Sequence, residues 1–252
     1  MVEGQTLDNG MIKCINSNSL QEAKNIPGLI DHARRSDFNG LELSLEPTGP
    51  LGEANWDDLR KEIGNSNLKI ASLTSTQFDL FTLAGLDGEP EKAAARHIIT
   101  QYLHRASSGN LDSMVLISAH ERRPWAQVAV NDYETAFNSL FQNLAELADT
   151  AEKLSVPMSI ENPAAGLLVS PLELRDFIDQ INSPYVGVCL NPTHAARLGN
   201  PLDWLGIFDQ RILAVHLNFP SASNSEEEGL YSDLLTNIKN RNRNIPIIYK
   251  NA

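Results

Sequence analysis

The sequence has only two cysteines, Cys14 and Cys189, and both fall in short apolar runs. This placement predicts buried thiols rather than a disulfide, which is typical of a reducing compartment, so we expect a cytoplasmic protein. Long apolar runs are absent too, because none approaches the ~20 residues that a membrane span needs. The first residues lack the basic start and apolar stretch of a signal peptide. We therefore expect no membrane association.

Basic residues are scarce, since 20 Lys and Arg stand against 32 Asp and Glu and give a net charge of −12. A protein that binds a phosphate backbone needs a basic face, so we expect no nucleic-acid partner. The chain has 252 residues, of which 42% are hydrophobic. This fits one domain over residues 1–252, with residues 1–10 as a loose lead-in.

Short apolar runs alternate with helical patterns along the whole chain. The runs lie at 11–16, 41–45, 68–74, 114–118, 156–160, 186–190, 212–215 and 246–250. Runs of this length between turn signals indicate strands buried on both faces, as in parallel sheets. With a helix or loop after each of the first seven, they predict an α/β fold, a (β/α)₈ TIM barrel. This pattern lacks the final outer helix, which would leave apolar surface exposed outside the eighth and first strands. We expect either the lead-in or a neighbouring subunit, as in a homodimer, to cover this surface. The alternative is that the chain is truncated.

Capping residues predict where several helices begin. Ser19, with a glutamate three residues later, predicts the start of the first helix, in which Pro27 marks either a start or a kink. Asp132 predicts the N-cap of a long helix, and Pro171 predicts the first position of another. Residues 221–228 are expected to form a polar, acidic loop.

Residues 75–90 form a long connection between the third strand and the next helix. Connections of this length in compact domains are often functional. Several apolar residues, among them Phe78 and Phe81, make the segment apolar enough to fold over a cavity as a lid. The alternative is a short packed helix that only covers the barrel.

Polar residues follow the later strands directly. Glu161 follows the fifth run, Asn191 and His194 follow the sixth, His216 follows the seventh, and Lys250 ends the eighth. Because the C-terminal ends of parallel strands meet on one side of a barrel, where such folds bind ligands, we expect these side chains to share a site.

Other candidates are open to two interpretations each. His120 and Arg122 follow the fourth strand, where a guanidinium can hold a phosphate or carboxylate, but a solvated loop is the alternative. Glu42 lies within the second strand, where it either contacts substrate or pairs with a side chain of a neighbouring strand. His216 either points into the pocket or is a hydrogen-bonded core histidine, and Lys250 is either part of the site or frayed at the chain end.

The chain resembles the xylose isomerase-like TIM barrels, the sugar phosphate isomerase/epimerase superfamily. The resemblance covers nearly the whole chain and rests on FNGLEL at 38–43, IEN at 160–162, VGVCLNPTH at 186–194 and RILAVHL at 211–217. It implies a divalent metal that polarises the oxygens of a sugar, held by a Glu after strand five, an Asp after strand six, a His after strand seven and a Glu ending strand eight. The two Glu residues would move a proton between adjacent carbons.

This sequence departs from that ligand set at two positions. Glu161 and His216 match the first and third ligands, but Asn191 stands in place of the Asp and Lys250 in place of the last Glu. An ammonium carries only donors and cannot ligate a cation. We therefore expect no metal cofactor and a Lys250 ammonium paired with Glu161. The alternative is one divalent metal (Mn, Mg or Zn) on Glu161, Asn191 and His216.

Two functions follow from the resemblance. The first is a metal-free isomerase, epimerase or related lyase acting on a small polyol or keto-sugar, with Glu161 as base or acid, His194 and His216 polarising oxygens, and Lys250 stabilising an enediolate. Schiff-base chemistry at Lys250 is disfavoured because Glu161 would raise the pKa of this lysine. The second is a non-catalytic descendant with a binding or regulatory role. An abasic-site endonuclease would need a His-rich multi-metal cluster and a basic face, which this sequence lacks.

Overall fold

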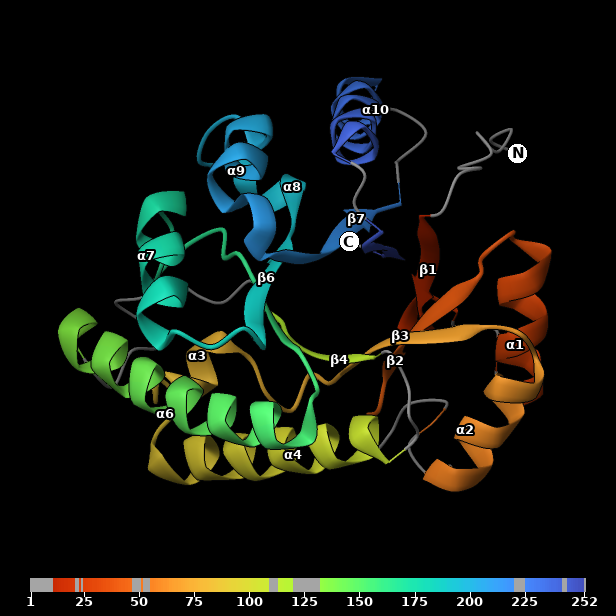
Figure 1. The fold of residues 1–252 in the computed structure, drawn as a ribbon, viewed down its shortest axis with the longest axis horizontal. Coiled ribbons are helices and arrows are strands. Elements are labelled where there is room, and N and C mark those ends of the chain that lie inside the picture. The colour runs from red at the N-terminus through yellow and green to blue at the C-terminus, as the bar shows by residue number, and fades with distance from the viewer. Residues whose placement is uncertain are drawn as a thin grey trace.

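Eight parallel strands pair in sequence order and close into a barrel in the computed structural model (Figure 1). The structure describes residues 11–20, 23, 25–46, 51, 55–108, 113–119, 132–219, 225–241 and 244–251. The strands are β1 (Ile12–Asn16), β2 (Gly40–Ser44), β3 (Lys69–Thr74), β4 (Met114–Ile117), β5 (Met158–Glu161), β6 (Val186–Leu190), β7 (Ile212–Asn218) and β8 (Pro246–Lys250). Each lies within a few residues of its predicted position, which confirms the α/β barrel. The predicted lead-in at 1–10 lies outside the described residues.

Helices surround the strands on the outside of the barrel (Figure 1). Those described are α1 (Ile26–Arg35), α2 (Trp56–Asn65), α3 (Leu80–Leu83), α4 (Glu89–Ser107), α6 (Tyr133–Leu154), α7 (Pro171–Ile181), α8 (Pro192–Ala196), α9 (Pro201–Phe208) and α10 (Ser225–Asn240). Helix α6 shows the usual pattern of one buried apolar face, since Leu140, Leu144 and Leu147 are buried at helical spacing.

Two helix starts differ from the sequence prediction. Helix α1 is capped by Asn25, whose side chain accepts a hydrogen bond from the Gly28 amide at 2.9 Å. Ser19 lies instead in a short 3₁₀ turn, so the predicted cap at Ser19 is wrong. Pro27 stands in the first turn of α1, where its missing N–H removes no helical hydrogen bond. Helix α10 begins at Ser225, inside the stretch expected to be a loop, so that prediction is wrong for its second half.

Two other predicted starts are confirmed. The Asp132 side chain accepts a hydrogen bond from the Thr135 amide at 2.8 Å and so caps α6. Pro171 is the first residue of α7.

The segment at 75–90 contains α3 and is packed against the barrel. Phe78, Leu80 and Leu83 are fully buried, and the Leu80 amide donates to the Ser118 carbonyl after β4 at 3.0 Å. The structure therefore shows the short packed helix of the two alternatives, and movement as a lid stays a prediction.

The barrel interior changes from apolar to polar along the strands. Cys14, Cys189, Ala214 and Ile248 belong to one buried apolar cluster, and both cysteines are free thiols as predicted. Side chains two residues apart share a face of a strand, so the next inward position on these four segments lies one layer nearer the C-terminal end. Those positions carry Asn16, Asn191, His216 and Lys250. The strand period thus stacks a polar layer on an apolar one.

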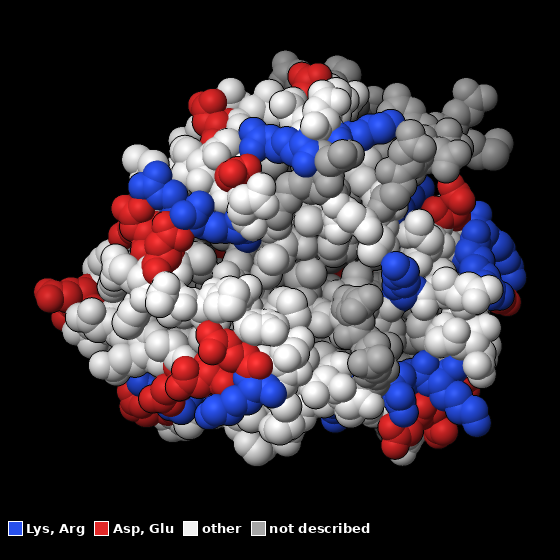
Figure 2. Space-filling model, viewed as in Figure 1, with Lys and Arg blue, Asp and Glu red and all other residues white. Residues whose placement is uncertain are grey.

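Acidic and basic side chains lie next to one another around the periphery of the face shown in Figure 2. Among the described residues, no helix is long and apolar enough to cross a bilayer.

Candidate functional site

The Glu161 carboxylate is the centre of the polar layer. It ends β5, is fully buried, and accepts four hydrogen bonds. Three donors meet Oε1: Lys250 Nζ at 2.7 Å, His216 Nδ1 at 2.8 Å and Asn191 Nδ2 at 2.9 Å. The Ala119 amide reaches Oε2 at 3.0 Å. The predicted Lys250–Glu161 ion pair is therefore present, and Glu161 keeps little capacity for another donor.

Glu42 forms a second buried carboxylate on the opposite side of His216. Its Oε1 accepts from Asn16 Nδ2 at 2.7 Å, and its Oε2 accepts from Ser72 Oγ at 2.7 Å and from His216 Nε2 at 3.2 Å. His216, which is only 2% exposed, thus bridges the two carboxylates. We call Glu42, Glu161, His216 and Lys250 the charge quartet.

The contacts of His216 determine its protonation state. An ionised carboxylate can only accept, so both ring nitrogens must carry hydrogen, which makes the ring an imidazolium. Burial by itself lowers the pKa of His216, yet its surroundings raise the pKa well above the usual value. The adjacent Cys189 thiol is neutral, because burial raises its own pKa, so the two carboxylates supply the countercharge.

The other members of the quartet are held charged in the same way. Burial alone would raise the pKa of Glu161, but the Lys250 ammonium and the His216 imidazolium hold it well below its usual range. Burial would raise the pKa of Glu42 too, but the charge and hydrogen bond of His216 lower it. Burial would lower the pKa of Lys250, but Glu161 raises it. The quartet therefore balances two positive against two negative charges without any external ion.

This donor set does not fit a divalent cation. Lys250 places an ammonium against the carboxylate oxygen that would have to ligate the ion, and both nitrogens of His216 carry hydrogen. Among the described residues, no group of three or more His, Cys, Asp or Glu side chains is arranged to hold a metal ion. The arrangement supplies hydrogen-bond donors where ligand oxygens are needed.

Asn191 turns its oxygen away from Glu161. Its Oδ1 caps α8 by accepting from the amides of Thr193 and His194 at 3.1 and 3.2 Å, while Nδ2 donates to Glu161. A flipped amide would set Nδ2 against two N–H donors, so the hydrogen bonds fix this orientation. The oxygen that would ligate a metal is thus already used.

His194 lies in α8 at the edge of the same layer. Its Nδ1 is 2.9 Å from the carbonyl oxygen of Asn162, the residue after Glu161, and the side chain is half-buried. The ring is close enough to Glu161 to help lower the pKa of that carboxyl.

The structure brings most of the predicted site residues together. Lys250 is not frayed, since its paired side chain is only 21% exposed. His216 is the hydrogen-bonded core histidine of the two alternatives, and with both nitrogens bonded it has none left for a substrate. Glu42 pairs with side chains of neighbouring strands, as its second interpretation proposed. His120 and Arg122 lie outside the described residues.

Sequence reasoning missed three polar partners: Asn16, Ser72 and Asn162. Asn16 and Ser72 bind Glu42, while Asn162 exchanges two hydrogen bonds with the Asn191 backbone. Each is a polar residue within or directly after an apolar run, and this position was the available signal.

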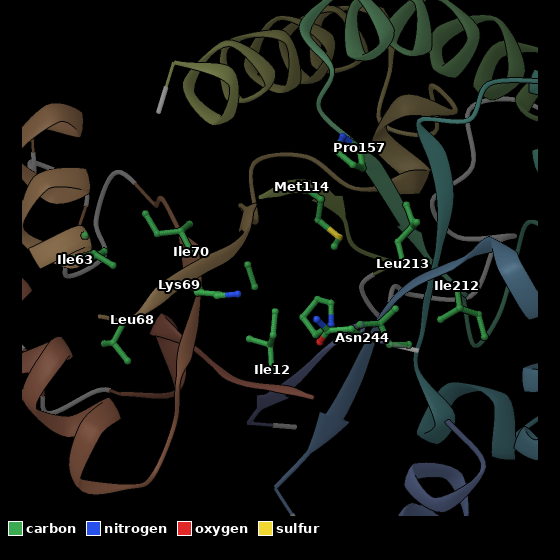
Figure 3. A pocket seen from close by; sticks show the side chains of 14 residues that line it. Ile12, Ile63, Leu68, Lys69, Ile70, Met114, Pro157, Ile212, Leu213 and Asn244 are labelled. Atoms are coloured by element: carbon green, nitrogen blue, oxygen red, sulfur yellow. The ribbon is translucent and has the colours of Figure 1, made fainter. Parts of the chain in front are cut away.

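A pocket of about 510 Å³ lies at the opposite end of the barrel (Figure 3). Residues at the starts of strands line it, such as Ile12 in β1, Lys69 in β3 and Pro246 in β8. Figure 3 shows the Lys69 side chain extending into the space between these strands. Barrels of this type bind substrates at the C-terminal end, so we place the candidate site at the quartet and not in this pocket.

Comparisons with known proteins identify the same architecture. A family model described as xylose isomerase-like TIM barrel matches residues 30–245. A comparison with the curated proteins found no match. The 3-keto-D-glucoside 4-epimerase of E. coli has 12% identity and a TM-score of 0.80, over 96% of this chain and 92% of that chain. A D-tagatose 3-epimerase-like protein has 17% identity and a TM-score of 0.73, over 96% and 92%. The D-allulose 3-epimerase of Methylomonas sp., in complex with D-allulose, has 14% identity and a TM-score of 0.70, over 96% and 84%. At these identities the likeness shows the fold alone.

Proposed function

The chain belongs to the xylose isomerase-like TIM-barrel family, and from this premise we propose that it binds a small keto-sugar or polyol at the C-terminal end of the barrel and isomerises or epimerises it without a divalent metal. The observation that carries the proposal is the 2.7 Å contact between Lys250 Nζ and Glu161 Oε1. This contact supports a site in which the fixed Lys250 ammonium supplies the positive charge that a metal ion would otherwise supply.

Lys250 is the member of the quartet that we assign to the substrate. The other three side chains are at most 2% exposed, whereas Lys250 is 21% exposed. An ammonium has three N–H donors, and among the described residues Lys250 uses one of them, in its hydrogen bond to Glu161. The remaining donors suit a carbonyl or hydroxyl oxygen of a sugar and would stabilise negative charge on that oxygen during enolisation.

Glu161 and His216 then have a positioning role. Glu161 holds Lys250 by charge and hydrogen bond, and His216 with Glu42 neutralises the rest of the layer. A carboxylate whose pKa is held well below its usual range is a weak base, because a general base works best with a pKa near the working pH. We therefore assign proton transfer to another group.

The four hydrogen bonds that Glu161 accepts also favour a second candidate function, which is non-catalytic sugar binding. Its four donors remove one base that the family resemblance implies, and Lys250 replaces the other. A barrel of this kind would retain a sugar without moving protons.

One experiment tests the proposal and separates both candidates. The purified protein is analysed for Mn, Mg and Zn before and after soaking in excess metal. The metal-free protein is then incubated in D₂O with D-fructose, D-allulose, D-tagatose and L-ribulose, while calorimetry measures ketose binding and NMR measures deuterium uptake at carbon.

We expect no stoichiometric metal, measurable binding of at least one ketose, and deuterium incorporation. Binding without incorporation would favour the non-catalytic function. About one metal per chain, with exchange that stops on chelation, would overturn the metal-free proposal.

A further inference from the structure

The charge quartet contains no group that can accept a proton from a sugar carbon. Glu42 and Glu161 are buried carboxylates engaged by hydrogen-bond donors and by the imidazolium between them. His216 and Lys250 are held protonated by those same carboxylates. If the site moves protons, the base must lie outside the quartet.

Glu46, another carboxylate at this end of the barrel, is also engaged. Its oxygens accept hydrogen bonds from Ser44, Ser75 and Thr76, and the residue is 8% exposed. These bonds hold it among the connections after β2 and β3 and use its acceptor capacity. It is therefore a structural carboxylate.

His194 differs from all of these groups. Its Nδ1 faces the carbonyl oxygen of Asn162 at 2.9 Å, and a carbonyl can only accept, so Nδ1 carries the hydrogen. In the neutral ring Nε2 is then unprotonated and has a free lone pair. Within the described part of the chain, no hydrogen-bond partner meets Nε2, and the half-buried ring stands beside the strand end that carries Glu161.

We propose that Nε2 of His194 is the single proton-transferring base of this site and that the Lys250 ammonium is its electrophilic partner. The inference rests on the proposed function and names its reaction class. A single base suits transfer of a proton between adjacent carbons of an α-hydroxy-carbonyl sugar, which interconverts an aldose and a ketose. Inversion at one carbon needs a second base on the opposite face of the sugar.

The reaction balances without an oxidant or a cofactor. Nε2 takes the proton from C2 of an open-chain aldose, and the C–H electron pair forms the C1–C2 double bond of an enediolate. The former carbonyl oxygen O1 takes up the negative charge and a hydrogen bond from Lys250. The hydroxyl proton moves from O2 to O1, Nε2 returns its proton to C1, and the charge collapses to a C2 carbonyl. The C1 carbonyl is reduced and C2 is oxidised within one molecule.

The test uses a variant that removes the base and keeps the structural hydrogen bond. In His194→Asn, the amide nitrogen can replace Nδ1 as the donor to the Asn162 carbonyl, but no atom replaces Nε2. His104→Asn, on the exposed surface of α4, is the matched control. Each protein is incubated with D-glucose and D-allose deuterated at C2, and NMR follows conversion and the position of the label. Calorimetry with D-fructose and D-allulose measures binding.

We expect the wild-type protein and His104→Asn to form ketose with part of the deuterium transferred to C1, because one base carries the label between the carbons. His194→Asn should be at least 100-fold slower and bind ketose within about threefold of wild type. Undiminished conversion by His194→Asn, or label lost entirely to solvent with inversion at one carbon, would overturn the inference and leave the proposed function standing. No conversion or exchange by the wild-type protein would overturn both the inference and the catalytic part of the proposed function.

Discussion

Lys250 Nζ and Glu161 Oε1 lie 2.7 Å apart, although 89 positions separate the two residues in the sequence. They end β8 and β5, two strands that are not neighbours in the barrel, so the ion pair crosses its interior. Lys250 thereby occupies the position from which the family resemblance implies a metal ligand, and it brings the opposite charge.

Restoring the implied ligand set should create a metal site. Asn191→Asp with Lys250→Glu adds two negative charges and removes one positive charge, the ammonium, whose repulsion with a divalent ion is worth several kcal/mol even at an effective dielectric of ~20. One Asp oxygen can keep the cap of α8 while the other turns toward Glu161. We expect the double variant to bind about one Mn²⁺ per chain in calorimetry and electron paramagnetic resonance, and the wild-type protein to bind none.

Lys250→Met is the control for this metal prediction, because it removes the ammonium without adding a ligand and should bind little Mn²⁺. Stoichiometric Mn²⁺ on the wild-type protein that disappears in Glu161→Gln would contradict the prediction.

Removing the Lys250 charge should destabilise the fold. Lys250→Met leaves the buried Glu161 carboxylate with one cation instead of two, and breaking such a pair costs about 2–4 kcal/mol. Urea unfolding measures the change. Lys69→Met, at the other end of the barrel, replaces an exposed lysine that forms no ion pair with any described residue, and it should change stability by less than about 0.5 kcal/mol. Equal effects of both substitutions would show that the ion pair contributes nothing.

His216 should make stability depend on pH on the alkaline side. Its pKa is raised in the folded state, so its contribution is complete below the unfolded pKa of ~6.5 and is lost as pH rises through the folded pKa. The slope cannot exceed about 1.4 kcal/mol per pH unit. Glu161 and Glu42 act in the opposite direction, because their lowered pKa values make stability fall below about pH 4.3.

The measurement for His216 is urea unfolding between pH 5 and 9, together with ¹⁵N NMR of the ring. We expect hydrogen on both ring nitrogens at pH 7.5, and no alkaline slope from this residue in His216→Gln. A neutral His216 ring at that pH would refute the charge assignment.

Gly187 in β6 should tolerate no side chain. A Cβ there would lie 2.5 Å from the Arg211 carbonyl oxygen and 2.6 Å from Leu213 Cγ. The neighbouring strand backbone cannot move aside without disturbing the barrel, so Gly187→Ala should cost about 2–4 kcal/mol in urea unfolding. Gly206→Ala in α9, with nothing within 4 Å of the new Cβ, should instead raise stability by up to about 1 kcal/mol. A neutral Gly187→Ala would contradict this account of the β6–β7 packing.

The sequence predicted the barrel because its signals are local. Apolar runs of strand length, such as 186–190, and caps such as Asp132 depend on residues close together in the chain, and the structure has both. Ser19 was misassigned because Asn25 and Pro27 offer a better helix start a few residues later, and capping patterns do not rank such competitors.

The sequence predicted most of the residues that form the candidate site, but only part of the contacts among them. The Lys250–Glu161 pair was predicted because the resemblance places Lys250 where a metal ligand beside Glu161 is implied, and the structure has this pair. The saturation of Glu161, the bridging of two carboxylates by His216 and the orientation of the Asn191 amide did not follow, because each depends on distances across the barrel.

The sequence by itself thus determined the family, the strand order and which residues replace the implied metal ligands, because these depend on residue types and their spacing. Only the tertiary structure decided which groups are charged and which atom is free. Protonation and hydrogen-bond direction depend on burial and on partners up to 174 positions away, as in the contact of His216 with Glu42. Closing the barrel brings those partners together.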